Sequence, residues 1–316
     1  MQALQGIIMK ILVYIVTYKK NDILNLNLKS LWASITEPSE VSVTVLANHP
    51  EIFIDQENIR PNLRVVHNTT RMPHAWGYLS RDWNFCILDA FKTWENPNSV
   101  DWLVLAQNDV IWVNGWDQTV RDNRQFDFIS QPTGDQALVL NINAVRKIGF
   151  FDERFTTLHF QEIDYFIRSL RAIPSRVSIT DTHPMHNYTH QPVGSVIVKN
   201  TFSGCVQDET LHNSSNMLAA KSMLIAKHGK LAMSNSAKNV IAEKIFASEI
   251  NWYPFFWRGY DEIENTFFCE TRVKAVQQRL EFFLRMRSFL FRIIFPSANL
   301  RSKIKLFFLK IRKHHD

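Results

Sequence analysis

Polar residues that directly follow apolar runs are the first candidates for chemistry in this sequence. Asp109 is the most informative of them, because a carboxylate there emerges at the end of the apolar run 103–106. Carboxylate oxygens are hard ligands that suit Mg²⁺ or Mn²⁺. The alternative is a turn or cap residue, since Asn and Asp favour turns. Similar positions are occupied by Thr17, Tyr18, Asn48, His49, Asn68, Gln107 and Asn108.

A second group of acids lies further along the chain. Glu162 and Asp164 stand two residues apart at the start of an amphipathic segment, with Ile163, Phe166 and Ile167 on one face. Acids at a helix start can simply interact favourably with the positive end of the helix dipole. The alternative is that one of them is a general base facing a bound substrate.

The elements that would position these residues follow from the apolar pattern. Buried strands are expected at 11–18, 41–47, 63–67 and 102–106, and amphipathic helices at 21–35 and 78–91. This alternation predicts an α/β fold with a largely parallel central sheet flanked by helices. In such a sheet, ligands bind beyond the carboxyl ends of the strands, which is where the polar groups stand.

The second half of the chain is expected to be more helical. Short strands are predicted at 128–129 and 137–141, and helical segments at 143–148, 162–170, 216–246 and 261–295. We therefore expect a catalytic or binding domain at 1–195, a mainly helical region at 196–270 and a basic amphipathic tail at 271–316.

Four segments together resemble the family-2 type of GT-A glycosyltransferase, especially its rhamnosyltransferase-like branch. The resemblance covers roughly residues 10 to 195. The segments are V-Y-I-V-T-Y (13–18), L-V-L-A-Q-N-D-V (103–110), I-G-F-F-D-E-R-F (148–155) and Q-E-I-D-Y-F-I-R (161–168).

The resemblance implies roles for individual residues. Asp109 matches the metal-binding acid of the family's D-x-D motif, and Glu162 and Asp164 match the catalytic base and its second acid. A histidine after the helix often supplies another metal ligand; His186 is our first candidate, with His183 and His190 as alternatives. The donor-binding positions are Thr17, Tyr18, Asn48, Arg81, Asn84, Asn108 and Asp109. Asn48 stands where the family commonly has an acid that contacts the base of the nucleotide.

The implied reaction transfers a hexosyl or deoxyhexosyl group from a nucleotide sugar to a glycan or lipid-linked acceptor. It is a single displacement with inversion that uses a divalent cation, Mn²⁺ or Mg²⁺, and it would serve polysaccharide biosynthesis. The alternative function is a non-catalytic GT-A-like binding or scaffold protein at the membrane surface. The metal motif has one acid, Asp109, and this leaves that alternative open.

Glycine and cysteine usage argues against other classes. With nine glycines, the sequence has neither the G-x-G-x-x-G of dinucleotide-binding folds nor the phosphate-binding G-x-x-x-x-G-K-[ST]. Cys86, Cys205 and Cys269 are widely spaced and contain no C-x-x-C pair, so neither a disulfide framework nor a structural zinc site is expected.

The positive charge is concentrated at the C-terminal end. The chain has 36 Lys and Arg against 30 Asp and Glu, and residues 272–316 hold twelve of the basic and two of the acidic ones. The rest is slightly acidic, which argues against nucleic-acid binding. Leu300, Ile304, Phe307, Phe308 and Ile311 share one helical face flanked by basic residues, a pattern typical of a helix in a membrane interface. The alternative is that the tail packs on the domain. We expect a cytoplasmic protein held peripherally on the inner face of the cell membrane.

Overall fold

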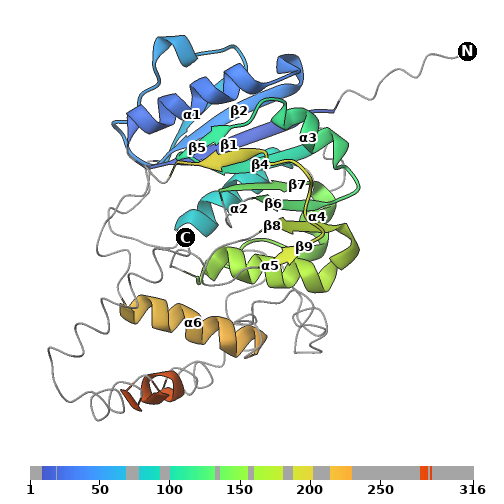
Figure 1. Ribbon diagram of the computed structural model, residues 1–316. Helices are drawn as coiled ribbons and strands as arrows, with labels where there is room; N and C mark the ends of the chain where they lie inside the picture. Colours follow the sequence, from blue (N-terminus) through green and yellow to red (C-terminus); the bar gives the residue numbers. More distant parts are fainter. Residues whose placement is uncertain are drawn as a thin grey trace, which may run out of the picture.

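The computed structural model describes residues 9–18, 20–68, 78–92, 100–131, 136–155, 160–180, 188–201, 214–229, 278–283 and 285–286. Within them the chain forms a mixed α/β fold with one large central sheet covered by helices on both faces (Figure 1). The α/β class with flanking helices, expected from the sequence, is confirmed.

The central sheet has the strand order β3-β2-β1-β4-β7-β6-β8-β9. Neighbours from β3 to β4 are all parallel, β4–β7 and β7–β6 are antiparallel, β6–β8 is parallel and β8–β9 is antiparallel. The strands are β1 (Ile11–Thr17), β2 (Val41–Ala47), β3 (Leu63–His67), β4 (Trp102–Gln107), β6 (Phe128–Gln131), β7 (Ala137–Leu140), β8 (Val177–Thr180) and β9 (Thr189–His190). Separately, β5 (Val110–Trp112) pairs with β10 (Val198–Asn200).

The parallel arrangement predicted for the sheet thus holds for β3, β2, β1 and β4 but gives way to mixed pairing beyond β4. The connection from β6 to β7 explains the change. Only five residues separate Gln131 from Ala137, whereas a parallel crossover needs about a dozen or more.

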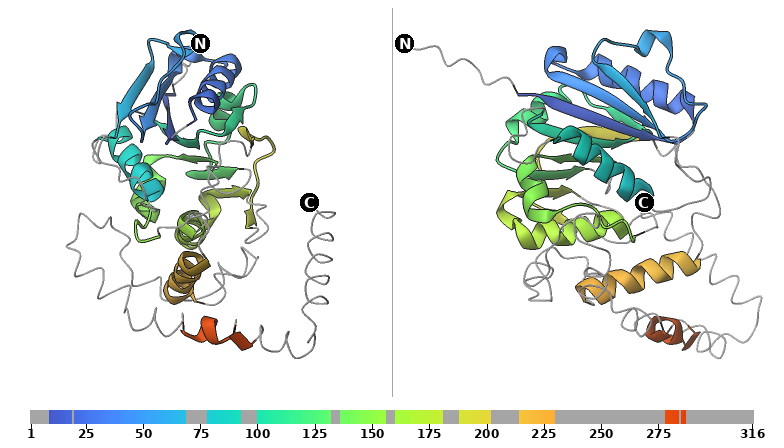
Figure 2. Two further views of the ribbon diagram at one scale, coloured as in Figure 1. Left: turned by 90° about the vertical axis from the view of Figure 1, so that its left-hand side faces the viewer. Right: turned by 180° about the vertical axis from the view of Figure 1, so that it is seen from behind.

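Helices α1 (Asn21–Ser34) and α3 (Trp116–Asp122) cover one face of the sheet, and α2 (Tyr78–Ala90), α4 (Ile142–Ile148) and α5 (Phe160–Ala172) cover the other (Figure 2). Alternation along β1 supplies both faces: Ile11, Val13 and Ile15 face α1, while Tyr14 and Val16 face α2. Short 3₁₀ turns occur at Pro38–Glu40, Gln56–Asn58 and Pro174–Arg176. Helix α6 (Ser214–His228) packs against α5.

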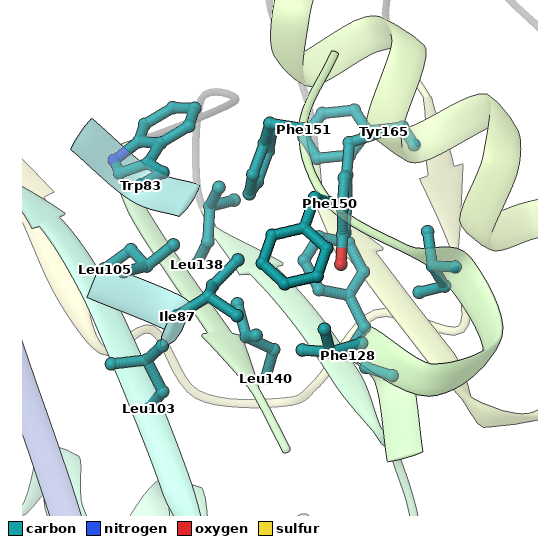
Figure 3. Close-up of a cluster of buried hydrophobic side chains, with 14 of the residues drawn as sticks. Trp83, Ile87, Leu103, Leu105, Phe128, Leu138, Leu140, Phe150, Phe151 and Tyr165 are labelled. Carbon is teal, nitrogen blue, oxygen red and sulfur yellow. The ribbon is translucent and has the colours of Figure 1, made fainter. Parts of the chain in front are cut away.

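The core on the α2 side is rich in aromatic side chains. Figure 3 shows Trp83, Phe150 and Phe151 gathered over Leu105 and Leu138 of the sheet. Phe151 stacks on Tyr165 of α5 with ring centroids 4.1 Å apart. This packing joins α2, the segment before α5, and α5 itself into one layer.

Only part of the predicted C-terminal region lies within the described residues. α6 confirms a helix there, whereas residues 230–277 and 287–316 lie outside the described part. The domain boundaries remain predictions, although β10 lies beyond residue 195 and pairs with β5 of the first region. In the described part of the basic tail, Phe282 is 59% exposed and Phe283 67%. Among the described helices, none combines the length and apolarity that a membrane crossing requires.

Candidate functional site

A row of hydrogen-bonded polar side chains lies along the carboxyl ends of β4, β1, β2 and β3. Asn108 Nδ2 donates to Thr17 Oγ1 at 3.2 Å, and the Asn48 backbone N–H donates to the Thr17 carbonyl at 2.8 Å. Asn48 Nδ2 donates to Asp82 Oδ2 at 2.6 Å, and Asn68 Nδ2 donates to Asn48 Oδ1 at 2.9 Å. The structure therefore brings three predicted donor-binding residues together at this edge.

Tyr18 continues this row towards solvent. It is partly exposed and its ring meets the ring of His49 edge-on, with centroids 5.7 Å apart. The aromatic pair stands beyond the ends of β1 and β2, beside the buried amide of Asn48.

The turn that carries Asp109 is held from two sides. Asn27 of α1 donates from Nδ2 to the carbonyls of Gln107 and Asn108, at 3.0 and 3.1 Å. From the other side, the Thr201 backbone N–H and hydroxyl both donate to the Asp109 carbonyl, at 3.0 and 2.9 Å. These bonds fix the backbone of the turn, and therefore the place of the Asp109 side chain.

The Asp109 carboxylate is only 3% exposed, and its Oδ1 has no hydrogen-bond partner among the described residues. Burial raises the pKa of this carboxyl above its ordinary value. A buried, incompletely bonded carboxylate is costly, and a cation would remove that cost. Asp109 therefore fits the role of an oxygen ligand to a divalent cation, although the described residues include no group of three or more metal-ligating side chains.

Glu162 lies near the start of α5, at the same edge of the sheet. Only Ile173 and the turn Pro174–Arg176 separate the end of α5 from the first residue of β8. Helix α5 therefore runs back along the sheet, and its first residues lie near the carboxyl end of β8. β8 is parallel to β6, and β6 runs in the same direction as β4 because both are antiparallel to β7. In Figure 1 the start of α5 and the ends of β1 and β4 lie on the same side of the molecule. The Glu162 side chain is buried there, at 1% exposure.

Asp164 points away from Glu162 and is fully buried. Successive helical residues differ by about 100°, so residues two apart lie on nearly opposite sides of α5. Asp164 accepts from Arg168 Nε at 2.8 Å and lies 2.6 Å from Lys227 Nζ and 2.7 Å from His228 Nε2. Burial would raise the pKa of Asp164, but Lys227, Arg168 and the hydrogen bond from His228 hold it well below its usual range. Its predicted role as second catalytic acid stays a prediction, and the geometry favours a role in holding α5.

Arg168 and Lys227 connect this helix to the segment before it. Arg168 donates to the carbonyls of Ile148 and Phe150, at 2.6 and 2.8 Å. Lys227 Nζ lies 2.7 Å from Asp152 Oδ2 as well as beside Asp164, so one ammonium bridges two carboxylates.

His228 is neutral in this network. A guanidinium can only donate, so the 3.1 Å contact with Arg171 Nη1 makes His228 Nδ1 an acceptor. Nε2 then carries the proton and donates to Asp164 Oδ1 at 2.7 Å. Burial lowers the pKa of His228 to about 4, and the hydrogen bond to Asp164 opposes that shift.

Two predicted donor-binding residues on α2 contact the segment before α5. Asn84 Nδ2 donates to the Phe151 carbonyl and to Glu153 Oε1, both at 2.9 Å, and Asn84 Oδ1 accepts from the Phe151 N–H at 2.8 Å. Arg81 is mostly exposed, with Nε 3.4 Å from Glu153 Oε2. Asn84 thus fixes this segment, and donor contact by Asn84 and by Arg81 stays a prediction.

Among the candidate metal-binding histidines, His183 and His186 lie outside the described residues. Their role as metal ligands stays a prediction. His190 does not fit the role. It belongs to β9, four strands from β4, and at about 4.8 Å per strand this separation is about 19 Å. His190 Nε2 also bonds to the Pro174 carbonyl at 2.7 Å.

No family model matches the sequence, and no curated protein matches it significantly. Solved structures do align with the chain. TarS from S. aureus aligns with a TM-score of 0.43 and 11% identity, covering 81% of this chain and 45% of that one. TarS 1–349 in complex with UDP gives 0.46 and 13%, covering 81% and 74%. The mannosyltransferase PcManGT from Pyrobaculum calidifontis, in complex with GDP-Man and Mn²⁺, gives 0.39 and 11%, covering 68% and 61%.

These alignments are remote in both sequence and structure. The chain spans less than half of the first TarS structure and about three-fifths of PcManGT. The assignment of a function therefore depends on this chain's own residues.

Four contributors to the site region were not predicted from the sequence. Asn27 and Asp82 act from helices on opposite faces of the sheet, and Lys227 and His228 come from α6. Asp82 follows Arg81, which was singled out, so the next position offered a signal. The other three have no local motif, because their partners lie dozens of residues away in sequence.

Proposed function

We propose that this chain is a GT-A-type glycosyltransferase that uses a nucleotide-sugar donor. The observation that carries the proposal is the buried Asp109 carboxylate, with an oxygen lacking a hydrogen-bond partner in the described part of the chain, at the edge where β1, β2 and β4 end. Two of the segments that resemble this family, 13–18 and 103–110, carry polar residues at that same edge, and Glu162 of a third lies near the start of α5 on that side. The sugar is transferred to a glycan or lipid-linked acceptor, with inversion at the anomeric carbon.

The donor is bound along the polar row. Thr17, Asn48 and Asn108 offer hydroxyl and amide groups, and the exposed part of Tyr18 offers an aromatic surface beside them. Asp109 is the proposed ligand for Mn²⁺ or Mg²⁺, with His186 as a second ligand. A bound divalent cation acts as a Lewis acid that neutralises the charge developing on the nucleoside diphosphate.

Glu162 is the proposed general base. It accepts the proton of the acceptor hydroxyl as that oxygen attacks the anomeric carbon. Its burial keeps water away from the carboxylate, and its position in the first turn of α5 places it near the positive end of the helix dipole. A positioned base of this kind contributes about 10²- to 10⁴-fold in rate.

The test compares Glu162→Gln with the wild type. Purified protein is screened with UDP-, GDP- and dTDP-sugars and Mn²⁺, for binding and for release of nucleotide with a set of acceptor glycans. We expect Glu162→Gln to bind the donor like the wild type and to lose transfer by about 10²-fold or more. Glu57→Gln, an exposed glutamate that pairs with Lys29, serves as the matched control. Wild-type turnover by Glu162→Gln would remove Glu162 from the role.

The second candidate is a non-catalytic GT-A-like binding or scaffold protein. It is favoured by the single acid of the metal motif and by the lack of a three-ligand group in the described part of the chain. Nucleotide binding without donor hydrolysis or transfer, for every sugar in the screen, would support this alternative.

We also propose that the protein lies on the cytoplasmic face of the cell membrane through residues 271–316. The excess of basic residues there would attract anionic lipid, at ~1 kcal/mol for each residue near the surface. In the described part of this region, Phe282, Phe283 and Met286 are exposed, and so is the Arg285 side chain beside them.

A further inference from the structure

A buried network of charged and polar side chains joins three parts of the chain beneath the proposed base. The network comprises Asp152 of the segment before α5, Asp164 and Arg168 of α5, and Lys227 and His228 of α6. All five residues are at most 7% exposed, and in each of the four pairs that they form the nitrogen and oxygen atoms are 2.6 to 2.8 Å apart. None of these residues belongs to the polar row at the ends of β1, β2 and β4.

The contacts fix both the position and the rotation of α5. Asp164 is held by three donors, from Arg168, Lys227 and His228. Arg168 also bonds to two backbone carbonyls of the preceding segment. Since hydrogen bonds depend on direction, a rotation of α5 about its axis would break several of them together.

Apolar packing could hold α6 on α5 without the desolvation cost of burying charged groups. The same contact already includes Leu224 and Ala220 of α6 within the hydrophobic core. Burying charges costs desolvation energy that ion pairing often does no more than recover, so a buried network is weak evidence for stability alone. What such a network adds over apolar contacts is a unique orientation.

We propose that Lys227 and His228 of α6 are positioning residues that hold the Glu162 carboxylate in its catalytic orientation through Asp164. This inference rests on the proposed function, because it takes Glu162 as the base. Glu162 and Asp164 lie within one turn of α5 on nearly opposite sides, so a shift at one is transmitted directly to the other. A misplacement of about 1 Å costs as much as 10²-fold in rate.

The experiment uses the full chain and the donor sugar that the wild type turns over. Lys227→Met and His228→Leu are expected to keep the dissociation constant for the corresponding nucleotide and to lower kcat about 10- to 100-fold. Lys227→Arg restores a cation and should recover part of the loss. The number of nucleotide-binding sites per chain, measured by calorimetry, gives the folded fraction to which kcat is referred, so that simple loss of folded protein is corrected for.

Lys221→Met is the matched control, since Lys221 lies on α6 and is only partly buried. His228→Leu leaves Asp164 paired with Arg168 and Lys227, so it decides the question if Lys227→Met does not fold. Wild-type kcat in every folded variant would overturn the positioning role while leaving the proposed function intact. A wild type that turns over no nucleotide sugar would instead remove the proposed function, and this inference with it.

Discussion

Asp109 and Glu162 are both buried carboxylates, yet their surroundings differ. The backbone of Asp109 is fixed by α1 and by Thr201, and its Oδ1 lacks a hydrogen-bond partner among the described residues. Glu162 stands in the first turn of a helix whose other side is held by ion pairs. The first arrangement suits a cation, and the second suits a base that must keep one orientation.

The variant Asp109→Asn should separate two effects of this buried carboxylate, its destabilisation of the fold and its proposed binding of a metal ion. Without added metal, the neutral amide removes an uncompensated buried charge, so we expect a melting temperature equal to or above that of the wild type. Mn²⁺ together with nucleotide should stabilise the wild type by mass action and the variant much less. Thermal denaturation with and without Mn²⁺ and UDP or GDP measures both effects.

Asp122→Asn is the control for that series, because Asp122 is exposed on α3. Equal stabilisation of the wild type and Asp109→Asn by Mn²⁺ and nucleotide would rule out Asp109 as a metal ligand.

At the residue scale, the sequence predicted the polar groups that directly follow apolar strands. Thr17, Asn48 and Asn108 were found in this way, and the structure brings them together. Asn84 was chosen by resemblance; its amide is bonded to Phe151 and Glu153, and its contact with a donor stays a prediction. These partners could not be predicted from the sequence, because Phe151 and Glu153 lie more than sixty residues away along the chain.

At the scale of elements, the long apolar runs were predicted well. The strands at 41–47 and 63–67 have the predicted bounds, and α1 and α2 differ from their predictions by one residue. β5, β8, β9 and β10 were missed, since they have two to four residues each. Strands this short carry little periodicity, and β10 pairs with β5 across more than eighty residues of sequence.

The junction of α5 and α6 should make stability sensitive to mild acid. Burial depresses the pKa of His228 from 6.5 to about 4, so between these values the unfolded state binds the proton and the folded state does not. Stability is therefore fully present above about pH 6.5 and is lost as pH falls towards 4, by about 3 kcal/mol at most. Urea unfolding of the wild type from pH 7 to pH 4.5 should show this loss, and His228→Leu should show much less of it.

Asp152 and Asp164 titrate at a lower pH than His228 and do not contribute to this loss of stability. Their pKa values are lowered from 3.8, so their contribution declines only at more acidic pH. An unchanged slope between pH 6.5 and 4.5 in His228→Leu would mean that another group titrates there.

At the scale of the whole molecule, charge is divided between a slightly acidic body and a basic C-terminal end. Deleting Leu300–Asp316 should move the protein from the membrane fraction to the soluble fraction, because it removes six basic residues together with the apolar face of the predicted interfacial helix. Co-sedimentation with vesicles containing phosphatidylserine measures the binding. Binding of the wild type should weaken as salt is raised.

Two controls apply to this test. Vesicles of neutral phosphatidylcholine show whether binding needs anionic lipid, and the melting temperature shows whether the deletion leaves the rest of the protein folded. The shortened chain should keep the melting temperature of the wild type. If it sediments with anionic vesicles as the wild type does, these residues do not anchor the protein.

The bond between Thr201 and Asp109 has a consequence for how the protein matures. Asp109 leaves the ribosome more than ninety residues before Thr201, so the nascent chain carries the acid long before the residue whose hydrogen bonds restrain it. β1, β2, β3 and β4 can already pair by then, while the turn still lacks one of its two restraints. The proposed donor site is therefore expected to be completed late in translation, after the sheet that supports it.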